Sequence, residues 1–131
     1  MAKKQKYVDL YASVGKNDYF GTVFDGMCKS DAYKNLSLSA KHFYTLCRVQ
    51  SQSKHGRQCL YKHSEESERN YNDNDFVFPS SHLKLYGIDR GNAKRYFDEL
   101  IKAGFVDRKE CNKVRKKMNV YSFSNRWKNT S

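Results

Sequence analysis

One segment near the start of the chain repeats apolar residues at the spacing of an amphipathic helix. In residues 37–53 the repeating positions, three or four apart, are Ala40, Phe43, Leu46 and Cys47. Ser37 or Ser39 precedes them, and a serine hydroxyl at that place can accept a hydrogen bond from an early backbone N–H of the helix. The pattern predicts a first core helix over residues 37–53.

A second amphipathic segment covers residues 90–103. Its apolar stripe consists of Ala93, Phe97, Leu100 and Ile101. Asp89 stands where an N-cap is expected, and Gly104 stands where a helix ends. Just before it, residues 80–86 predict a helix of under two turns with a serine cap and a closing Gly87. The two helices would be joined by a tight turn.

Short stretches rich in Tyr, Phe and Val predict strands. Residues 75–78 ("DFVF") indicate a brief strand that Pro79 stops, and residues 105–123 indicate two strands joined by a basic loop around 110–117. Residues 7–24 contain "YVDLY" and "YFGTVF", which favour an extended conformation. Residues 54–75 are polar, with room for a short helix over about 57–67.

The order of these elements predicts an α+β fold, namely a winged helix-turn-helix. It would carry an N-terminal aromatic, strand-like extension and a C-terminal β-hairpin wing. We divide the chain into an extension over 1–35 that packs on the domain, and a winged-helix domain over 36–128 with a polar insertion at 54–75.

The amino-acid composition indicates that the protein binds an anionic partner. Lys and Arg number 25 against 14 Asp and Glu, which gives a net charge of +11. Such an excess favours binding to nucleic acid, an anionic membrane or an acidic protein. No apolar run approaches the ~18 residues of a membrane span, and the basic start lacks the apolar region of a signal peptide. We expect a cytoplasmic protein that does not bind membranes.

The charges of segment 90–103 are distributed in an unusual way. Helix N-termini carry positive partial charge, and acidic residues are usually found there. In this segment the first acidic residues after Arg90 are Asp98 and Glu99. Because the apolar stripe packs inward, Gly91, Asn92, Arg95 and Lys102 should lie on the outer side, with Arg90 and Lys94 flanking the leading end. These positions predict a recognition helix over about 90–103, with major-groove contacts from Arg90, Gly91, Asn92, Lys94 and Arg95.

The basic excess continues into the C-terminal region. Residues 105–131 hold eight Lys and Arg against two acids, a net charge of +6, whereas residues 54–75 have a net charge of −1. A wing over about 108–118 would contact the DNA backbone through Arg108, Lys109, Lys113, Arg115, Lys116 and Lys117. The short helix would add contacts from Ser80, Ser81 and Lys84.

Three segments carry a resemblance to a known family: "SDAYKNLSLSAKHFYTLC", "DFVFPSSHLKLYGIDRGNAKRYFDELIKAGFVD" and "VYSFSNRWK". Over about residues 30–128 the chain is similar to small winged-helix DNA-binding proteins of Gram-positive conjugative elements and plasmids, and to the N-terminal domains of their replication initiators. The resemblance implies an accessory transfer factor that binds double-stranded DNA near an origin of transfer. A transcriptional autorepressor or a replication-initiator-like DNA binder is the alternative.

Other classes of function have weaker support in the sequence. We find no phosphate-binding glycine loop, no HExxH and no paired-acid motif, so we expect no enzyme, no cofactor and no small-molecule substrate. His55, Cys59 and His63 share a helix face but would not close a metal tetrahedron, so we expect no metal. A winged helix that binds other transfer or replication proteins is the competing class.

Some single residues remain open between packing and binding. Tyr7, Tyr11, Tyr19 and Phe20 could stack on single-stranded bases, although such residues more often pack in the core. Trp127 is expected to fix the C-terminus to the domain rather than to stack on a base. His82 shows no partner in the sequence and is expected to be structural or solvated.

Overall fold

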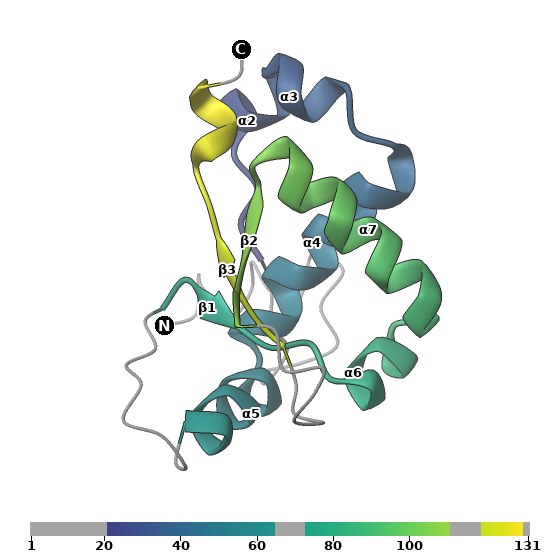
Figure 1. Ribbon diagram of the computed structural model, residues 1–131, viewed down its shortest axis with the longest axis vertical. Coiled ribbons are helices and arrows are strands. Elements are labelled where there is room, and N and C mark those ends of the chain that lie inside the picture. The colour runs from purple at the N-terminus through teal and green to yellow at the C-terminus, as the bar shows by residue number, and fades with distance from the viewer. Residues whose placement is uncertain (1–20, 65–72, 111–118, 130–131) are drawn as a thin grey trace, which may run out of the picture.

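The computed structural model describes residues 21–64, 73–110 and 119–129, which form an α+β fold (Figure 1). In chain order the elements are α2 (Asp25–Lys29), α3 (Asp31–Lys34), α4 (Leu38–Gln52), α5 (Lys54–Ser64), β1 (Asp75–Phe76), α6 (Ser80–Leu85), α7 (Arg90–Ala103), β2 (Val106–Glu110), β3 (Val120–Phe123) and the 3₁₀ helix η1 (Arg126–Asn129). The predicted order of helix, strand, short helix, helix and two strands is confirmed.

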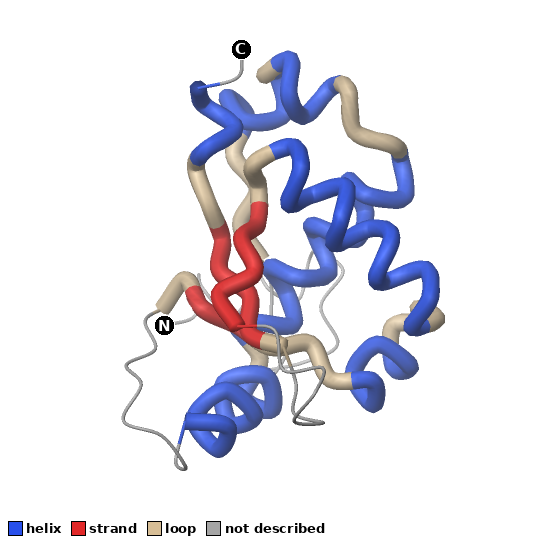
Figure 2. The backbone as a smooth tube through the Cα atoms, in the orientation of Figure 1, coloured by secondary structure: helices blue, strands red, loops and turns tan. Residues whose placement is uncertain are grey.

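The strands form one antiparallel sheet in the order β1-β3-β2. Asp75 pairs with Ser122 across β1 and β3, and Val106 pairs with Phe123 across β2 and β3. Figure 2 shows the strands gathered together, with α4 and α7 to one side of them. The last strand in sequence is therefore the central one, and it joins the short β1 to the longer β2.

Aromatic side chains of α4, α7 and the sheet make up the centre of the core. Phe97 of α7 stacks on Tyr121 of β3 with ring centroids 3.9 Å apart, and meets Phe43 of α4 edge-on at 4.8 Å. Phe76 of β1 stacks on Phe123 at 4.4 Å. Since such ring contacts add to the area that the side chains bury, Phe97 fixes α7 against both α4 and the sheet.

The ends of the two long helices follow from local chemistry. The Ser37 hydroxyl accepts from the Ala40 N–H at 3.1 Å, so Ser37 and not Ser39 caps α4. Glu99 of α7 also binds this cap, because its carboxylate accepts from the Ser37 N–H at 2.6 Å and from the hydroxyl at 2.9 Å. Gly104 ends α7 at φ 91°, and a Cβ there would lie 2.7 Å from the Trp127 nitrogen. Both predicted helix boundaries are confirmed.

Two local predictions near β1 were wrong in detail. Strand β1 ends at Phe76, although Val77 and Phe78 are buried as expected for the predicted strand 75–78. Pro79 rather than a serine occupies the N-cap of α6 and makes no side-chain cap bond. The reason is that the Pro79 carbonyl already accepts from the His82 and Leu83 N–H groups, which places Ser80 inside the first turn.

The N-terminal extension was predicted to be strand-like. Residues 21–24 have no regular structure, and residues 25–34 form the short helices α2 and α3. The hydroxyl of Ser30 caps α3 by accepting from the Tyr33 N–H at 3.2 Å, which favours a helical turn over an extended chain. Met27 of this region is buried in the core, and residues 7–20 of the prediction lie outside the described residues.

The polar segment 54–75 contains a helix that packs on the domain. Helix α5 begins three residues before the predicted start and ends at Ser64. Its Leu60 is buried with Val77 and Val120 in a second, smaller apolar cluster. The Arg57 guanidinium donates to the Asp75 carbonyl at 3.1 Å, which ties α5 to the start of β1.

Trp127 fixes the C-terminal 3₁₀ helix to the domain, as predicted. Its indole stacks on Phe105 with ring centroids 5.6 Å apart and an interplanar angle of 14°, and its backbone N–H donates to the Gly104 carbonyl at 3.1 Å. The end of α7 and the chain after β3 are thereby held together.

Cys47 of α4 should make the stability of the fold depend on pH in the alkaline range. The side chain is fully buried, and burial raises the pKa of its thiol well above the ordinary 9.0. The thiol therefore ionises at a lower pH in the unfolded chain than in the folded protein. The fold keeps its full stability below about pH 8 and loses stability progressively as the thiol of the unfolded chain ionises. We expect the free energy of unfolding to fall as pH rises past 9.0, and urea titrations at successive pH values measure it.

The Cys47→Ala variant should show a shallower decline over the same range. Cys28→Ala is the matched control because Cys28 is only half-buried. Burial also raises the pKa of Tyr44, whose ordinary value is 10.0, so measurements should stop near pH 9.5 to separate the two groups. Equal slopes in the parent protein and in Cys47→Ala would contradict this assignment.

Candidate nucleic-acid interface

Helix α7 carries the predicted set of side chains in its N-terminal half. Ala93, Phe97 and Leu100 are buried, and the N-terminal half of the helix leaves polar and basic groups on the other side. Among the five predicted major-groove residues the exposed ones are Arg90, Gly91, Lys94 and Arg95, and Asn92 is half-buried. The structure therefore brings all five residues together at the start of one helix.

The first turn of α7 combines an acidic cap with basic neighbours. The Asp89 carboxylate accepts from the Asn92 backbone N–H at 3.4 Å, and no acid lies in the first turn itself. The amide oxygen of Asn92 accepts from the Arg95 guanidinium, which also lies over the Tyr96 ring at 5.9 Å. Asn92 and Arg95 are thus ordered relative to each other before any ligand is bound.

Other cations of α7 have no such partner. Within residues 21–64, 73–110 and 119–129, the side chains of Arg90, Lys94 and Lys102 make no hydrogen bond or ion pair, and all three are exposed. Asp98 is the acid on this face, and it pairs with Arg108 at 3.4 Å. The face keeps a net positive charge and three cations that can contact an anion.

The predicted wing residues that the structure describes already have internal partners. Arg108 of β2 pairs with Asp98, and the Lys109 amine donates to the Asp75 carboxylate at 2.6 Å. The Asp75 side chain is only 1% exposed, so Lys109 neutralises a buried charge. Lys113, Arg115, Lys116 and Lys117 of the same prediction lie outside the described residues.

Helix α6 leads directly into α7 and lies beside it (Figure 1). Its predicted contact residues Ser80, Ser81 and Lys84 are all exposed. The turn between the helices contains Gly87 at φ 73°, a left-handed conformation that suits glycine. The three side chains are therefore accessible next to the start of α7, and their contact with DNA stays a prediction.

His82 has the partners that the sequence did not indicate. Its Nδ1 lies 2.9 Å from the side-chain nitrogen of the buried Gln50, and its Nε2 lies 4.0 Å from the Cys59 sulfur. The sequence did not reveal this contact because Gln50 and His82 lie on different helices and are 32 residues apart in the chain. In the described part of the chain, no group of three His, Cys, Asp or Glu side chains could hold a metal ion.

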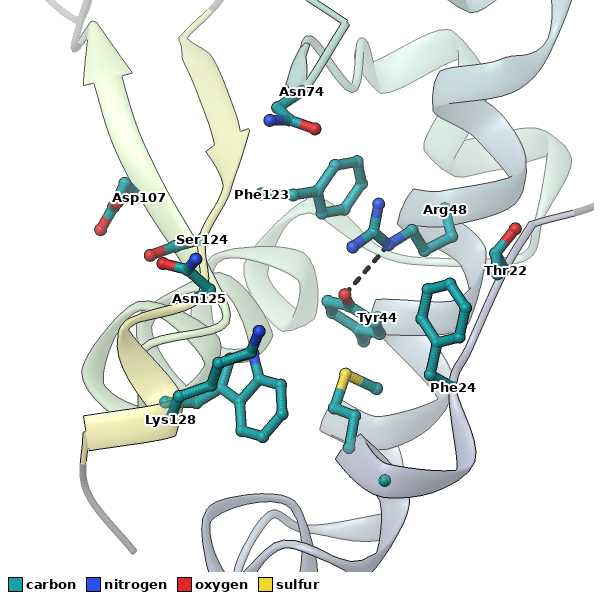
Figure 3. A pocket seen from close by; sticks show the side chains of 13 residues that line it. Thr22, Phe24, Tyr44, Arg48, Asn74, Asp107, Phe123, Ser124, Asn125 and Lys128 are labelled. Atoms are coloured by element: carbon teal, nitrogen blue, oxygen red, sulfur yellow. Dashed lines mark hydrogen bonds between the residues drawn. The ribbon is translucent and has the colours of Figure 1, made fainter.

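Sequence reasoning also missed a cavity on another part of the molecule. It has a volume of about 660 Å³ and lies between α4, the segment before α2, the end of β3 and η1 (Figure 3). Arg48 and Lys128 bring positive charge to it. The one signal in the sequence was the spacing of Tyr44 and Arg48, which are four residues apart and so adjacent on a helix.

Comparison of the chain with protein-family models, with curated proteins and with solved structures gives no match. None of the helices in the described residues has the length and apolar character that a membrane span requires.

Proposed function

We propose that this chain is a non-catalytic, sequence-preferring protein that binds double-stranded DNA through α7. The observation that carries the proposal is the exposure of Arg90, Lys94 and Arg95 at the start of that helix. Positive charge is unfavourable beside a helix N-terminus unless an anion is bound there. A DNA phosphate supplies that anion, and the backbone N–H groups of a helix start also suit phosphate.

The arrangement of the elements supports a winged helix as the fold that presents this face. Helices α6 and α7 are joined by a short turn, and in a helix-turn-helix the second helix enters the major groove. Strands β2 and β3 follow α7 as antiparallel neighbours. Their connection would be the wing over about 108–118 and would contact the backbone.

Arg95 and Asn92 are the side chains that we assign to base reading. A guanidinium can make paired hydrogen bonds to guanine, and a carboxamide can make them to adenine. Their mutual hydrogen bond supports this role because it reduces the side-chain freedom that would be lost on binding. Gly91 brings no side chain to the same face and would permit close approach of the duplex.

We place the protein in the cytoplasm as an accessory transfer factor of a conjugative mobile element, bound near the origin of transfer. This assignment rests on the family resemblance of residues 30–128. A transcriptional autorepressor or a replication-initiator-like DNA binder would use the same face of α7. Identification of the bound sequence distinguishes these roles.

A protein-binding winged helix predicts an apolar outer face on α7. The exposed residues of this helix are instead polar or basic. Tyr96, the one aromatic side chain near that face, is half-buried and packs against Phe43 with ring centroids 5.5 Å apart. The surface of α7 therefore favours nucleic acid over a protein partner.

Fluorescence anisotropy with labelled DNA tests the proposal. The probes are a random duplex, a single strand of equal length, and the duplex that flanks the protein's own gene. We expect tighter binding to duplex than to single strand, a further gain on the native flank, and a Kd that rises steeply between about 50 and 200 mM salt. Weak binding to all three probes would refute DNA binding as the function of the +11 charge.

A further inference from the structure

The cavity of about 660 Å³ has the size of a small-molecule site, since such sites usually measure ~300–1,000 Å³. Its lining residues come from α4, from residues 22–27 and from the chain around β3 and η1, with Asn74 and Asp107 of β2 added. Neither α6 nor α7 contributes to it. The cavity is therefore separate from the proposed DNA-binding face, and a ligand there would not compete for the same residues.

Arg48 is the central charged residue of this cavity. Figure 3 shows its guanidinium extending from α4 toward Phe123. The Nε donates to the Tyr44 hydroxyl at 2.9 Å, and the Cζ lies 3.9 Å from the centroid of the Phe123 ring. These contacts hold the planar group in one orientation, although the side chain is half-buried.

Arg48 has no carboxylate partner among the residues that the structure describes. The acid that lines the cavity is Asp107, and its carboxylate accepts from the Arg126 Nε at 2.7 Å. Charged side chains that leave water are usually paired. An ordered guanidinium that keeps its terminal amino groups available inside a cavity is therefore suited to bind an anion.

Aromatic side chains form much of the remaining wall. Trp127 is anchored on Phe105, and the Lys128 amine lies over the Trp127 ring at 5.7 Å. The Phe24 side chain lines the cavity while remaining 69% exposed, which is unusual for a large apolar group. These rings provide flat apolar surfaces within the same cavity as Arg48.

We propose that this cavity binds a small aromatic anion. The carboxylate or phosphate of the ligand accepts hydrogen bonds from the Arg48 guanidinium, with Lys128 adding positive charge. The ring of the ligand packs against the aromatic side chains of the cavity, and the apolar surface of those side chains becomes buried from water. Free nucleotides and aromatic carboxylic acids share this chemistry.

Isothermal titration calorimetry of the full chain tests the proposal with two aromatic anions, adenosine 5′-monophosphate and indole-3-acetate. Adenosine, inorganic phosphate and acetate supply the ring or the anion alone. We expect at least one aromatic anion to bind about tenfold more tightly than its separate parts, because only the whole ligand makes both sets of contacts. The probe that binds more tightly shows whether the cavity prefers a nucleotide or an aromatic carboxylic acid.

Arg48→Gln should weaken this binding by about tenfold or more, since it removes a charge-assisted hydrogen bond. Lys41→Gln is the matched control: it makes the same charge change on α4, but Lys41 lies over Tyr33 and outside the cavity. Because Arg48 also packs on Phe123, circular dichroism must show that the variant folds. Lys128→Gln, at an exposed residue, is the second variant and should weaken binding severalfold.

The affinity of Arg48→Gln for duplex DNA should stay unchanged, which keeps this test independent of the proposed function. Absence of binding by both aromatic anions would overturn the proposal. Binding that is equal in the parent protein, in folded Arg48→Gln and in Lys128→Gln would also overturn it.

Discussion

Lys109→Met is expected to lower the free energy of unfolding by about 3 kcal/mol, because it removes the ion pair that the Lys109 amine makes with the buried Asp75 carboxylate. The Lys109 amine is 2.6 Å from that carboxylate, whose side chain is only 1% exposed. Removing the partner of a buried carboxylate costs more than removing one member of an ion pair whose two charges are both exposed. Chemical denaturation of the variant measures the loss.

Arg108→Met is the matched control in the neighbouring position of β2. It removes the same charge, but its partner Asp98 is 56% exposed, and such pairs are worth about 0–1 kcal/mol. The double variant Asp75→Asn/Lys109→Met should recover a large part of the lost stability, because it removes the buried charge as well. A loss no larger than that of Arg108→Met would contradict the structural role of Lys109.

The same variants separate packing from DNA contact in the proposed wing. If Lys109 serves the fold alone, folded Lys109→Met should keep the salt dependence of DNA binding. A residue that contacts phosphate would instead reduce the slope of log K against log salt by about 0.9. The result decides whether the wing prediction over residues 108–118 includes this lysine.

Arg95→Ala is expected to cost about 1–3 kcal/mol of binding free energy on the preferred DNA sequence and to reduce the preference for that sequence. The reason is that a guanidinium reads a base edge through two hydrogen bonds, whereas a phosphate contact carries no sequence information. Anisotropy with the native flank and with a random duplex of equal length measures both effects. The variant should fold normally, because Arg95 is exposed.

Lys102→Ala is the control on the same helix. Lys102 is also exposed, but it lies in the last turn of α7, away from the basic N-terminal half. Its removal should lower the affinity for all duplexes slightly and leave sequence preference intact. An unchanged preference in Arg95→Ala would show that α7 does not read bases through this residue, even if the protein binds DNA.

The local features of the fold could be predicted because their signals lie close together in the sequence. Apolar spacing placed α4 and α7, and the caps Ser37 and Asp89 and the terminal Gly104 were found at their predicted positions. Helical periodicity alone then put Arg95 on the side away from the buried stripe and put Arg90 and Lys94 at the flanks of the helix start, and all three are exposed. The error at Pro79 also has a local cause, since a serine cap and a serine in the first turn look alike in the sequence.

Only the tertiary structure decided which charges remain available for a ligand. The strand order β1-β3-β2 brings Lys109 close to Asp75, which is 34 residues away in the chain. No local sequence pattern predicts that pairing. The same holds for the contact of His82 with Gln50, and for the cavity that Arg48, Phe123 and Lys128 line. The sequence by itself determined α4, α7 and their caps, and the basic start of α7, because those depend on residues a few positions apart. Packing decided which basic residues serve the core and which face a ligand, because burial and pairing depend on residues that are distant along the chain.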